Sequence, residues 1–157
     1  MFTISLVVVA ALHAEIIDRV LAVVAGVAIT QSDATAALEL GLVTPRGTGD
    51  PLAGALTQLV ERQLMLMEVD RYLPPEPPED AVNRRLQAIR DRFPSAPAYQ
   101  AALRRSGADD NRLRQSVRDA LRIEAYLDQR FSVPPLTAER RETLIGEWVN
   151  GLSDSIR

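Results

Sequence analysis

The side chains that could carry out chemistry in this sequence are almost all carboxylates. The chain contains no cysteine, and its one histidine, His13, lies in an apolar N-terminal segment that we expect to be removed. Without Cys and His, a protein lacks the ligands of most zinc sites and the groups of most triad-type active sites. Two close carboxylate pairs remain, Glu76 with Glu79 and Asp109 with Asp110.

Both carboxylate pairs occupy ordinary structural positions. Glu76 and Glu79 belong to a proline-rich stretch, while Asp109 and Asp110 precede a predicted helix, where acidic side chains interact favourably with the helix dipole. Acid–base or glycosidase chemistry requires two carboxyls that face one cleft, and no pattern in the sequence groups these residues in that way. We therefore predict that the protein is not an enzyme and that it uses no metal ion and no cofactor.

Flexible and aromatic apolar residues form a second set of candidates, for binding rather than catalysis. Met65 and Met67 lie in the longest predicted helix, and the unbranched, polarizable Met side chain suits surfaces that accept many sequences. Tyr72, Tyr126 and Trp148 could stack on aromatic segments of a bound chain. Residues of these types commonly fill a core as well, so the sequence leaves both roles open for all five.

Composition limits the protein class further. The 157 residues suit about one domain, and 46% hydrophobic with 25% charged residues is ordinary for a globular protein. The net charge is −3 and the pI is near 5.2, so the chain as a whole has no basic field that would attract nucleic acid.

The candidate residues must be positioned by a long central helix predicted over residues 51–73. Asp50-Pro51 precedes this helix and Pro74-Pro75 follows it, and both pairs are typical of helix boundaries. Between Leu64 and Met67 four apolar residues are consecutive, so this turn is apolar nearly all round and must be covered on several sides. We expect a mainly α fold in which shorter helices wrap the central one.

The remaining elements are predicted from local patterns. Residues 16–30 are rich in Val and Ile around Ala25-Gly26, which favours a short β-hairpin over one buried helix. Thr30 and Asp33 have capping-box spacing, so a helix should run from there to Leu40 and end at Gly41. Further helices are expected over residues 79–93, 98–105 and 109–131, and a last one after Thr137 either completes the core or presents its apolar side to a partner.

Three arginines four residues apart, Arg114, Arg118 and Arg122, form a ridge on the predicted helix 109–131. A ridge of like charge could bind an anionic partner. Because Asp110 and Asp119 are within helical reach of the ridge, we instead predict a solvated face that is partly paired within its own helix.

The first 14 residues have the pattern of a secretory signal peptide. An apolar run from Ile4 to Leu12 is too short to span a bilayer and ends near the small residue Ala14. The alternatives are an N-terminal core strand and an uncleaved membrane anchor. We expect cleavage before Glu15, export, and no stable membrane insertion afterwards.

Three stretches, taken together, resemble the N-terminal module of SurA-type periplasmic chaperones. The family's hairpin and first helix are matched by Val20, Ala22, Val23, Val24, Ile29, Thr30, Ser32 and Asp33. Its long helix is matched by Leu59, Val60, Glu61, Leu64 and Glu68, with Val69 where a small residue is usual. A later helix is matched by Leu113, Arg114, Val117, Arg118, Leu121, Ile123 and Leu127.

This resemblance covers residues 16–131 and implies an ATP-independent chaperone that binds unfolded outer-membrane proteins in the periplasm through an apolar groove. In the family, one or two parvulin-type prolyl isomerase domains normally follow the matched region. Here residues 132–157 follow, and they resemble the family's closing helix that packs on the N-terminal module. The resemblance thus implies the chaperone module, residues 15–157, without isomerase activity. An assembly adaptor that binds one folded partner is the alternative.

Overall fold

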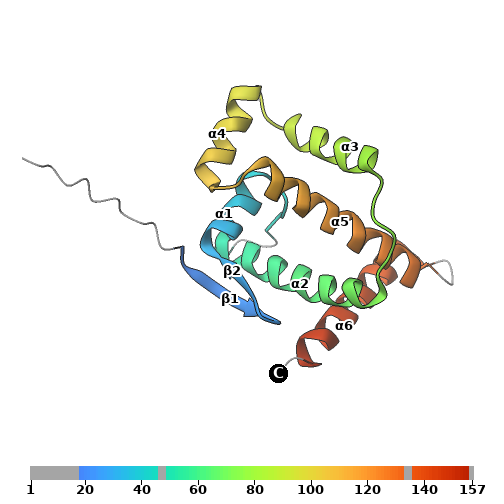
Figure 1. The fold of residues 1–157 in the computed structure, drawn as a ribbon. Helices are drawn as coiled ribbons and strands as arrows, with labels where there is room; N and C mark the ends of the chain where they lie inside the picture. Colours follow the sequence, from blue (N-terminus) through green and yellow to red (C-terminus); the bar gives the residue numbers. More distant parts are fainter. Residues whose placement is uncertain (1–17, 46–48, 133–135, 156–157) are drawn as a thin grey trace, which may run out of the picture.

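The computed structural model describes residues 18–45, 49–132 and 136–155, and within them the fold is mainly α, as predicted (Figure 1). A two-stranded antiparallel hairpin, β1 (Val20–Val24) and β2 (Val27–Thr30), precedes the helices. The helices are α1 (Gln31–Glu39), α2 (Pro51–Tyr72), α3 (Glu79–Arg90), α4 (Ala96–Ser106), α5 (Asp110–Arg130) and α6 (Ala138–Ser155). The predicted signal peptide, residues 1–14, lies outside the described residues.

The hairpin turns through two residues that both have left-handed backbone conformations, Ala25 with φ 50° and Gly26 with φ 82°. Positive φ at both central positions is the mark of a type I′ turn, whose twist matches that of the flanking strands. Val24 is therefore paired with Val27 beside the turn, and Val23 with Ala28 one step further. The hairpin, rather than a single buried helix, is confirmed.

Helix α1 begins at the predicted capping box. Thr30 Oγ1 accepts a hydrogen bond from the Asp33 backbone N–H at 3.2 Å, and Asp33 Oδ2 accepts one from the Thr30 backbone N–H at 2.9 Å. The last helical residue is Glu39, with Leu40 as the C-cap, and Gly41 follows with φ 62°. A positive φ is adopted by glycine without a steric penalty, so the sequence located this helix end correctly.

Helix α2 is the central rod, and its predicted bounds hold to within one residue. Asp50 accepts a hydrogen bond from the Leu52 backbone N–H at 3.0 Å, and Leu73 ends the helix in a left-handed conformation with φ 43°. The helix contacts α1, α5, α6 and both strands. Figure 1 shows α2 between the hairpin and the C-terminal helices, which confirms a central helix covered on several sides.

Two predicted helix boundaries need correction. Helix α3 ends at Arg90 rather than near Phe93, and Phe93 instead packs edge-on against Tyr99 with ring centroids 5.6 Å apart. Helix α4 begins at Ala96 rather than Ala98, because Ser95 caps it by accepting the Ala98 backbone N–H. Pro97 lies in the first turn, where its missing N–H is not needed.

The apolar core consists of three clusters that α2 and α5 connect. The first joins α1, α3, α4 and α5 through the buried residues Leu40, Val82, Leu86, Ile89, Tyr99, Ala102, Leu103, Leu113 and Val117. The second joins the hairpin to α2 through Val24, Ile29 and Leu64, with Leu152 of α6 packed against it. The third joins α2 to α5 through Val69, Ile123 and Tyr126, with Trp148 of α6 packed against it.

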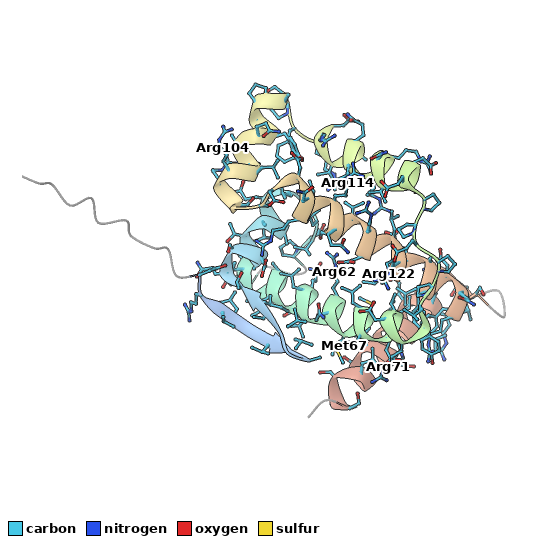
Figure 2. All side chains as sticks on the ribbon, in the orientation of Figure 1. Arg62, Met67, Arg71, Arg104, Arg114 and Arg122 are labelled. Carbon is cyan, nitrogen blue, oxygen red and sulfur yellow. The ribbon has the colours of Figure 1, made fainter. Side chains whose placement is uncertain are left out.

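The arginine ridge of α5 is not the internally paired, solvated face that we predicted. Arg114 donates a hydrogen bond to Glu79 at 2.9 Å, and Arg118 pairs with the same carboxylate, so both side chains join α5 to the start of α3. Arg122 donates to Asp70 of α2 at 2.7 Å and is only 13% exposed. Figure 2 shows Arg114 between α3 and α5, and Arg122 between α2 and α5. The ridge binds this protein's own carboxylates because the neighbouring helices bring acidic residues closer than α5 does.

Candidate binding cleft

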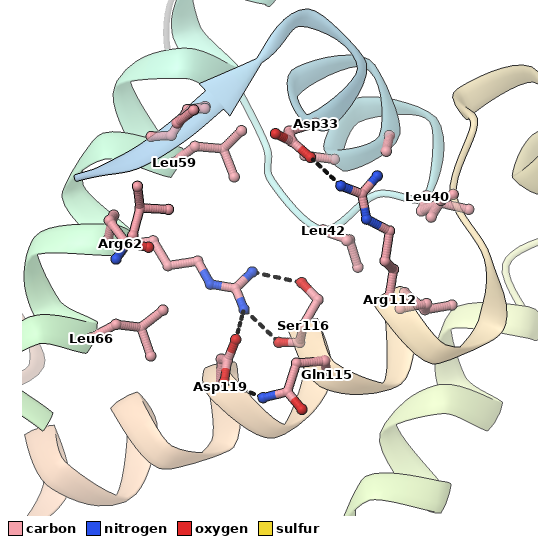
Figure 3. A pocket seen from close by; sticks show the side chains of 18 residues that line it. Asp33, Leu40, Leu42, Leu59, Arg62, Leu66, Arg112, Gln115, Ser116 and Asp119 are labelled. Atoms are coloured by element: carbon pink, nitrogen blue, oxygen red, sulfur yellow. Dashed lines mark hydrogen bonds and ion pairs between the residues drawn. The ribbon is translucent and has the colours of Figure 1, made fainter. Parts of the chain in front are cut away.

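A cleft of about 480 Å³ opens where β2, α1, α2 and α5 meet (Figure 3). Apolar side chains from these elements and from the segment after α1 form much of its wall. The larger ones are Val27, Ile29, Leu40, Leu42, Leu59, Leu66 and Leu113. Such a volume lies in the range of pockets that hold small ligands.

The cleft stays open because several residues that line it are too small to fill the space. Ala36 and Ala37 face it from α1, Ala108 from the loop before α5, and Ser116 from α5. Longer lining residues, such as Gln63 of α2, are polar. A polar side chain gains little from burial against hydrocarbon, so it does not close the gap as Leu or Phe would.

Arg62 of α2 and Asp119 of α5 are the largely buried charged residues of the cleft. Arg62 Nη1 donates a hydrogen bond to Ser116 Oγ at 2.8 Å and its Nη2 donates one to the Ser116 carbonyl oxygen at 2.6 Å. The nearest carboxylate oxygen, Asp119 Oδ2, lies 3.7 Å from Nη2, and the Arg62 side chain is 21% exposed. Desolvation lowers the pKa of the Arg62 guanidinium, while the charge of Asp119 opposes that shift.

A second arginine, Arg112 of α5, reaches the cleft from the opposite side and lies 3.7 Å from Asp33 Oδ1. Figure 3 shows the guanidinium groups of Arg62 and Arg112 entering the same space from two helices. Both ion pairs are longer than the 2.7–2.9 Å that is usual for a charge-assisted hydrogen bond. The cleft therefore combines apolar walls with two cations whose nearest carboxylate oxygens are 3.7 Å away.

Three of the five residues predicted from the sequence meet in an aromatic cluster away from this cleft. The rings of Tyr72 and Tyr126 have centroids 5.4 Å apart, and those of Tyr126 and Trp148 are 5.7 Å apart. Phe131 contacts Trp148, and the Arg130 guanidinium lies 5.3 Å from the centre of the Trp148 ring. Tyr126 is only 6% exposed whereas Tyr72 is 63% exposed, so Tyr126 is a core residue and Tyr72 is a surface residue.

The two methionines pack against different core clusters. Met65 packs against the cluster of Val69, Ile123 and Tyr126, whereas Met67 packs against the hairpin cluster around Val24 and Leu64. None of the five predicted residues lines the cleft. Tyr72 and Tyr126 line a smaller hollow of about 270 Å³ together with Pro74, Gln129 and Arg130.

The sequence analysis missed Arg62, although a signal was present. Leu59, Arg62 and Leu66 are spaced by three and four residues, so they share one face of α2. An arginine in the apolar stripe of a central helix must either pair inside the protein or face a gap. Its partners Ser116 and Asp119 are distant in sequence, and no local pattern connects them to Arg62.

The carboxylates of the two close acidic pairs have structural partners. Glu79 pairs with Arg114 and Arg118, and Asp109 caps α5 by accepting the Arg112 backbone N–H at 2.7 Å. Asp110 accepts a hydrogen bond from the Tyr99 hydroxyl at 3.0 Å. In the part of the chain that the structure describes, no three His, Cys, Asp or Glu side chains are grouped closely enough to hold a metal ion.

No helix among the described residues combines the length and the apolar character needed to cross a membrane. Comparison of the chain with protein-family models, with characterised proteins and with solved structures finds no match. Membership of the SurA-type family therefore stays a prediction from the three resembling stretches.

Proposed function

We propose that the protein is an ATP-independent holding chaperone, not an enzyme, that binds unfolded polypeptide segments in the cleft between β2, α1, α2 and α5. From the SurA-type resemblance we infer that it acts in the periplasm and that its clients are unfolded outer-membrane proteins. The observation that supports the proposal best is the cleft itself, about 480 Å³ with apolar walls from four elements.

The lining of the cleft suits a ligand with many different sequences. The partly exposed Leu42, Leu59 and Leu66 offer apolar surface to a bound segment. Gln63 has a flexible amide that both donates and accepts hydrogen bonds, so it can satisfy the backbone of a bound segment in more than one register. Adaptable contacts of this kind favour broad specificity over high affinity.

An aggregation assay with a matched pair of variants tests this function. A urea-unfolded outer-membrane β-barrel protein is diluted into buffer without ATP, with or without residues 15–157, and light scattering is followed. Val27→Asp places a charge in the cleft, whereas Val23→Asp places one on the exposed outer face of the same hairpin. The two valines are 46% and 64% exposed, so neither change should unfold the protein.

We expect the unmodified protein and Val23→Asp to suppress scattering at near-stoichiometric ratios, and Val27→Asp to lose most of the effect. Folding of each variant is checked by circular dichroism. Absence of suppression by the folded, unmodified protein would contradict the chaperone proposal.

One observation favours the adaptor alternative, in which the protein binds one folded partner. Val20 and Val23 expose 54% and 64% of their surface on β1, which makes an apolar outer face on the hairpin. Scattered exposed apolar residues are common, so this observation is weaker than the cleft. The adaptor role predicts that Val23→Asp, rather than Val27→Asp, disturbs function.

A further inference from the structure

The two arginines of the cleft have hydrogen-bonding capacity that the protein itself does not use. Arg62 donates two hydrogen bonds, both to the uncharged hydroxyl and carbonyl groups of Ser116. Among the described residues, the Arg112 guanidinium makes no hydrogen bond, and its nearest carboxylate oxygen is 3.7 Å away on Asp33. A guanidinium has five N–H donors, so both groups can still bind an acceptor.

The two aspartates are held by their own local structure rather than by these arginines. Asp119 Oδ1 accepts a hydrogen bond from Gln115 Nε2 at 2.8 Å, one turn earlier on α5. Asp33 Oδ2 accepts from Thr30 N and Oγ1, at 2.9 and 2.8 Å, in the capping box. Both carboxylates would keep these partners if an arginine turned towards a ligand.

The strand that borders the cleft favours a peptide over other apolar molecules. In a two-residue hairpin the pair beside the turn is hydrogen-bonded and the next pair is not. Val24 and Val27 form the first pair, so the backbone N–H and C=O of Ala28, in the second pair, point away from β1. Ala28 also lines the cleft. An extended segment in the cleft can therefore use this edge of β2 by strand addition.

We infer that the cleft selects extended polypeptide segments that carry a carboxylate among apolar residues, and that Arg62, assisted by Arg112, binds this carboxylate. The carboxylate can be an acidic side chain or the carboxyl end of the chain, since both offer the same two oxygens. Arg62 lies on one face of α2 with Leu59 and Leu66, which would hold the neighbouring apolar side chains. This inference rests on the proposed function, because it names which segments the same cleft would prefer.

Calorimetric titration with three short peptides of alternating Val and Ser tests the inference. One has a central Glu and an amidated end, the second has Gln in its place and an amidated end, and the third has Gln and a free carboxyl end. Because hydrogen bonds between two charged groups are stronger than those between neutral groups, we expect at least one acidic peptide to bind about tenfold more tightly than the neutral one. The acidic peptide that binds more tightly identifies the source of the carboxylate.

Variants of the full chain assign the effect to the cleft. Arg62→Met should abolish the preference, so that this variant binds the acidic and the neutral peptides with equal affinity. Arg112→Met should reduce the preference by about threefold, and its exposed side chain makes loss of folding a small risk. Arg104→Met is the matched control, because Arg104 is exposed on α4, at a distance from Arg62 in Figure 2.

Equal binding of all three peptides would overturn the inference, as would a preference that survives in Arg62→Met or is lost in Arg104→Met. Dodecanoate, which has a carboxylate but no peptide backbone, should bind more weakly than the acidic peptides. Equal affinity would overturn the inference that the ligand is a polypeptide segment. If all three peptides bind equally and Val27→Asp removes binding, the proposed function stands without this preference. If no peptide binds, both proposals fail.

Discussion

The two ends of the gap between α2 and α5 differ in how the protein fills them. Towards the C-terminal end of both helices, Val69, Ile123 and Tyr126 are buried together and Trp148 of α6 covers them. Near the middle of α2 and the first half of α5, Arg62 and Ser116 meet beside an open cleft. The same pair of helices thus supports a closed core at one end and a cleft at the other.

This difference shows that side-chain size and an extra covering helix decide where a cleft forms. At the closed end, large aromatic rings span the gap and α6 adds a third wall. At the open end, small residues such as Ala36 of α1 and Ser116 of α5 line the space, and the side chain that reaches from α2 to α5 is the polar Arg62 rather than an aromatic ring. The five residues predicted for binding were chosen for their large or flexible side chains, and such residues close gaps more often than they line them.

The closed end should be the more sensitive of the two to loss of volume. Tyr126→Ala removes a ring that is 6% exposed and contacts both Tyr72 and Trp148. We expect a loss of about 3–5 kcal/mol in the free energy of unfolding, the usual range for a large buried aromatic residue. Urea titration followed by circular dichroism measures the change. Tyr72→Ala, at a 63% exposed position, should cost less than about 1 kcal/mol; similar losses in both variants would contradict the comparison.

Insertion of a large side chain should destabilise the protein in a filled region but should be tolerated in the cleft. Ala102→Phe inserts a ring into the fully buried cluster of α3, α4 and α5 and should cost about 1–3 kcal/mol or more through overpacking. Ala36→Phe points the same ring into the cleft and should change stability by less than about 1 kcal/mol.

Suppression of client aggregation is the second measurement for Ala36→Phe and Ala102→Phe. Ala36→Phe should weaken suppression of aggregation because the ring occupies the space that a client would use. A large destabilisation by Ala36→Phe, equal to that of Ala102→Phe, would show that the cleft has no room for a side chain.

Removal of the largely buried Arg62 charge should have a moderate effect on stability. Arg62→Met removes one partner of the ion pair with Asp119 and both hydrogen bonds to Ser116. Loss of one partner of a fully buried pair costs about 3–5 kcal/mol, and because this pair is long and partly solvated we expect a loss of about 1–2 kcal/mol. Asp119 keeps its hydrogen bond from Gln115 in this variant. Thermal unfolding of the variant and the unmodified protein tests this, and a loss of several kcal/mol would mean that Arg62 is a structural clamp.

The smallest expected change concerns the hairpin that borders the cleft. Ala25 has φ 50°, in the left-handed region that Asn adopts more easily than Ala. Ala25→Asn should therefore stabilise the hairpin by about 0.5 kcal/mol without altering the cleft. Hydrogen exchange of the strand amides measures the effect, with Ala28→Asn as the control that lacks a positive φ.

Elements with strong local signals were predicted well. Asp50-Pro51 set the start of α2, and Ala25-Gly26 located the hairpin turn. The ends of α3 and α4 were misplaced by two or three residues, because tertiary contacts of Phe93 and the cap at Ser95 decide them.

The cleft could not be predicted in the same way. Arg62 and Ser116 are 54 positions apart, and only the packing of α5 beside α2 brings them together. The arginine ridge shows the same limitation: its partners Glu79 and Asp70 come from other helices. Patterns within one helix revealed which side chains were unusual but not which residues they would meet.

The position of Leu152 has a consequence for how the protein folds. This residue of α6 packs against the cluster formed by Val24, Ile29 and Leu64, so the first and last described elements meet on α2. Contacts between such distant parts of a chain form late and slow the folding reaction. The hairpin and α2 can pack on each other first, but this part of the core is complete only after α6 has docked. Until then the apolar surface that Leu152 covers is exposed, and transiently exposed apolar surface favours aggregation.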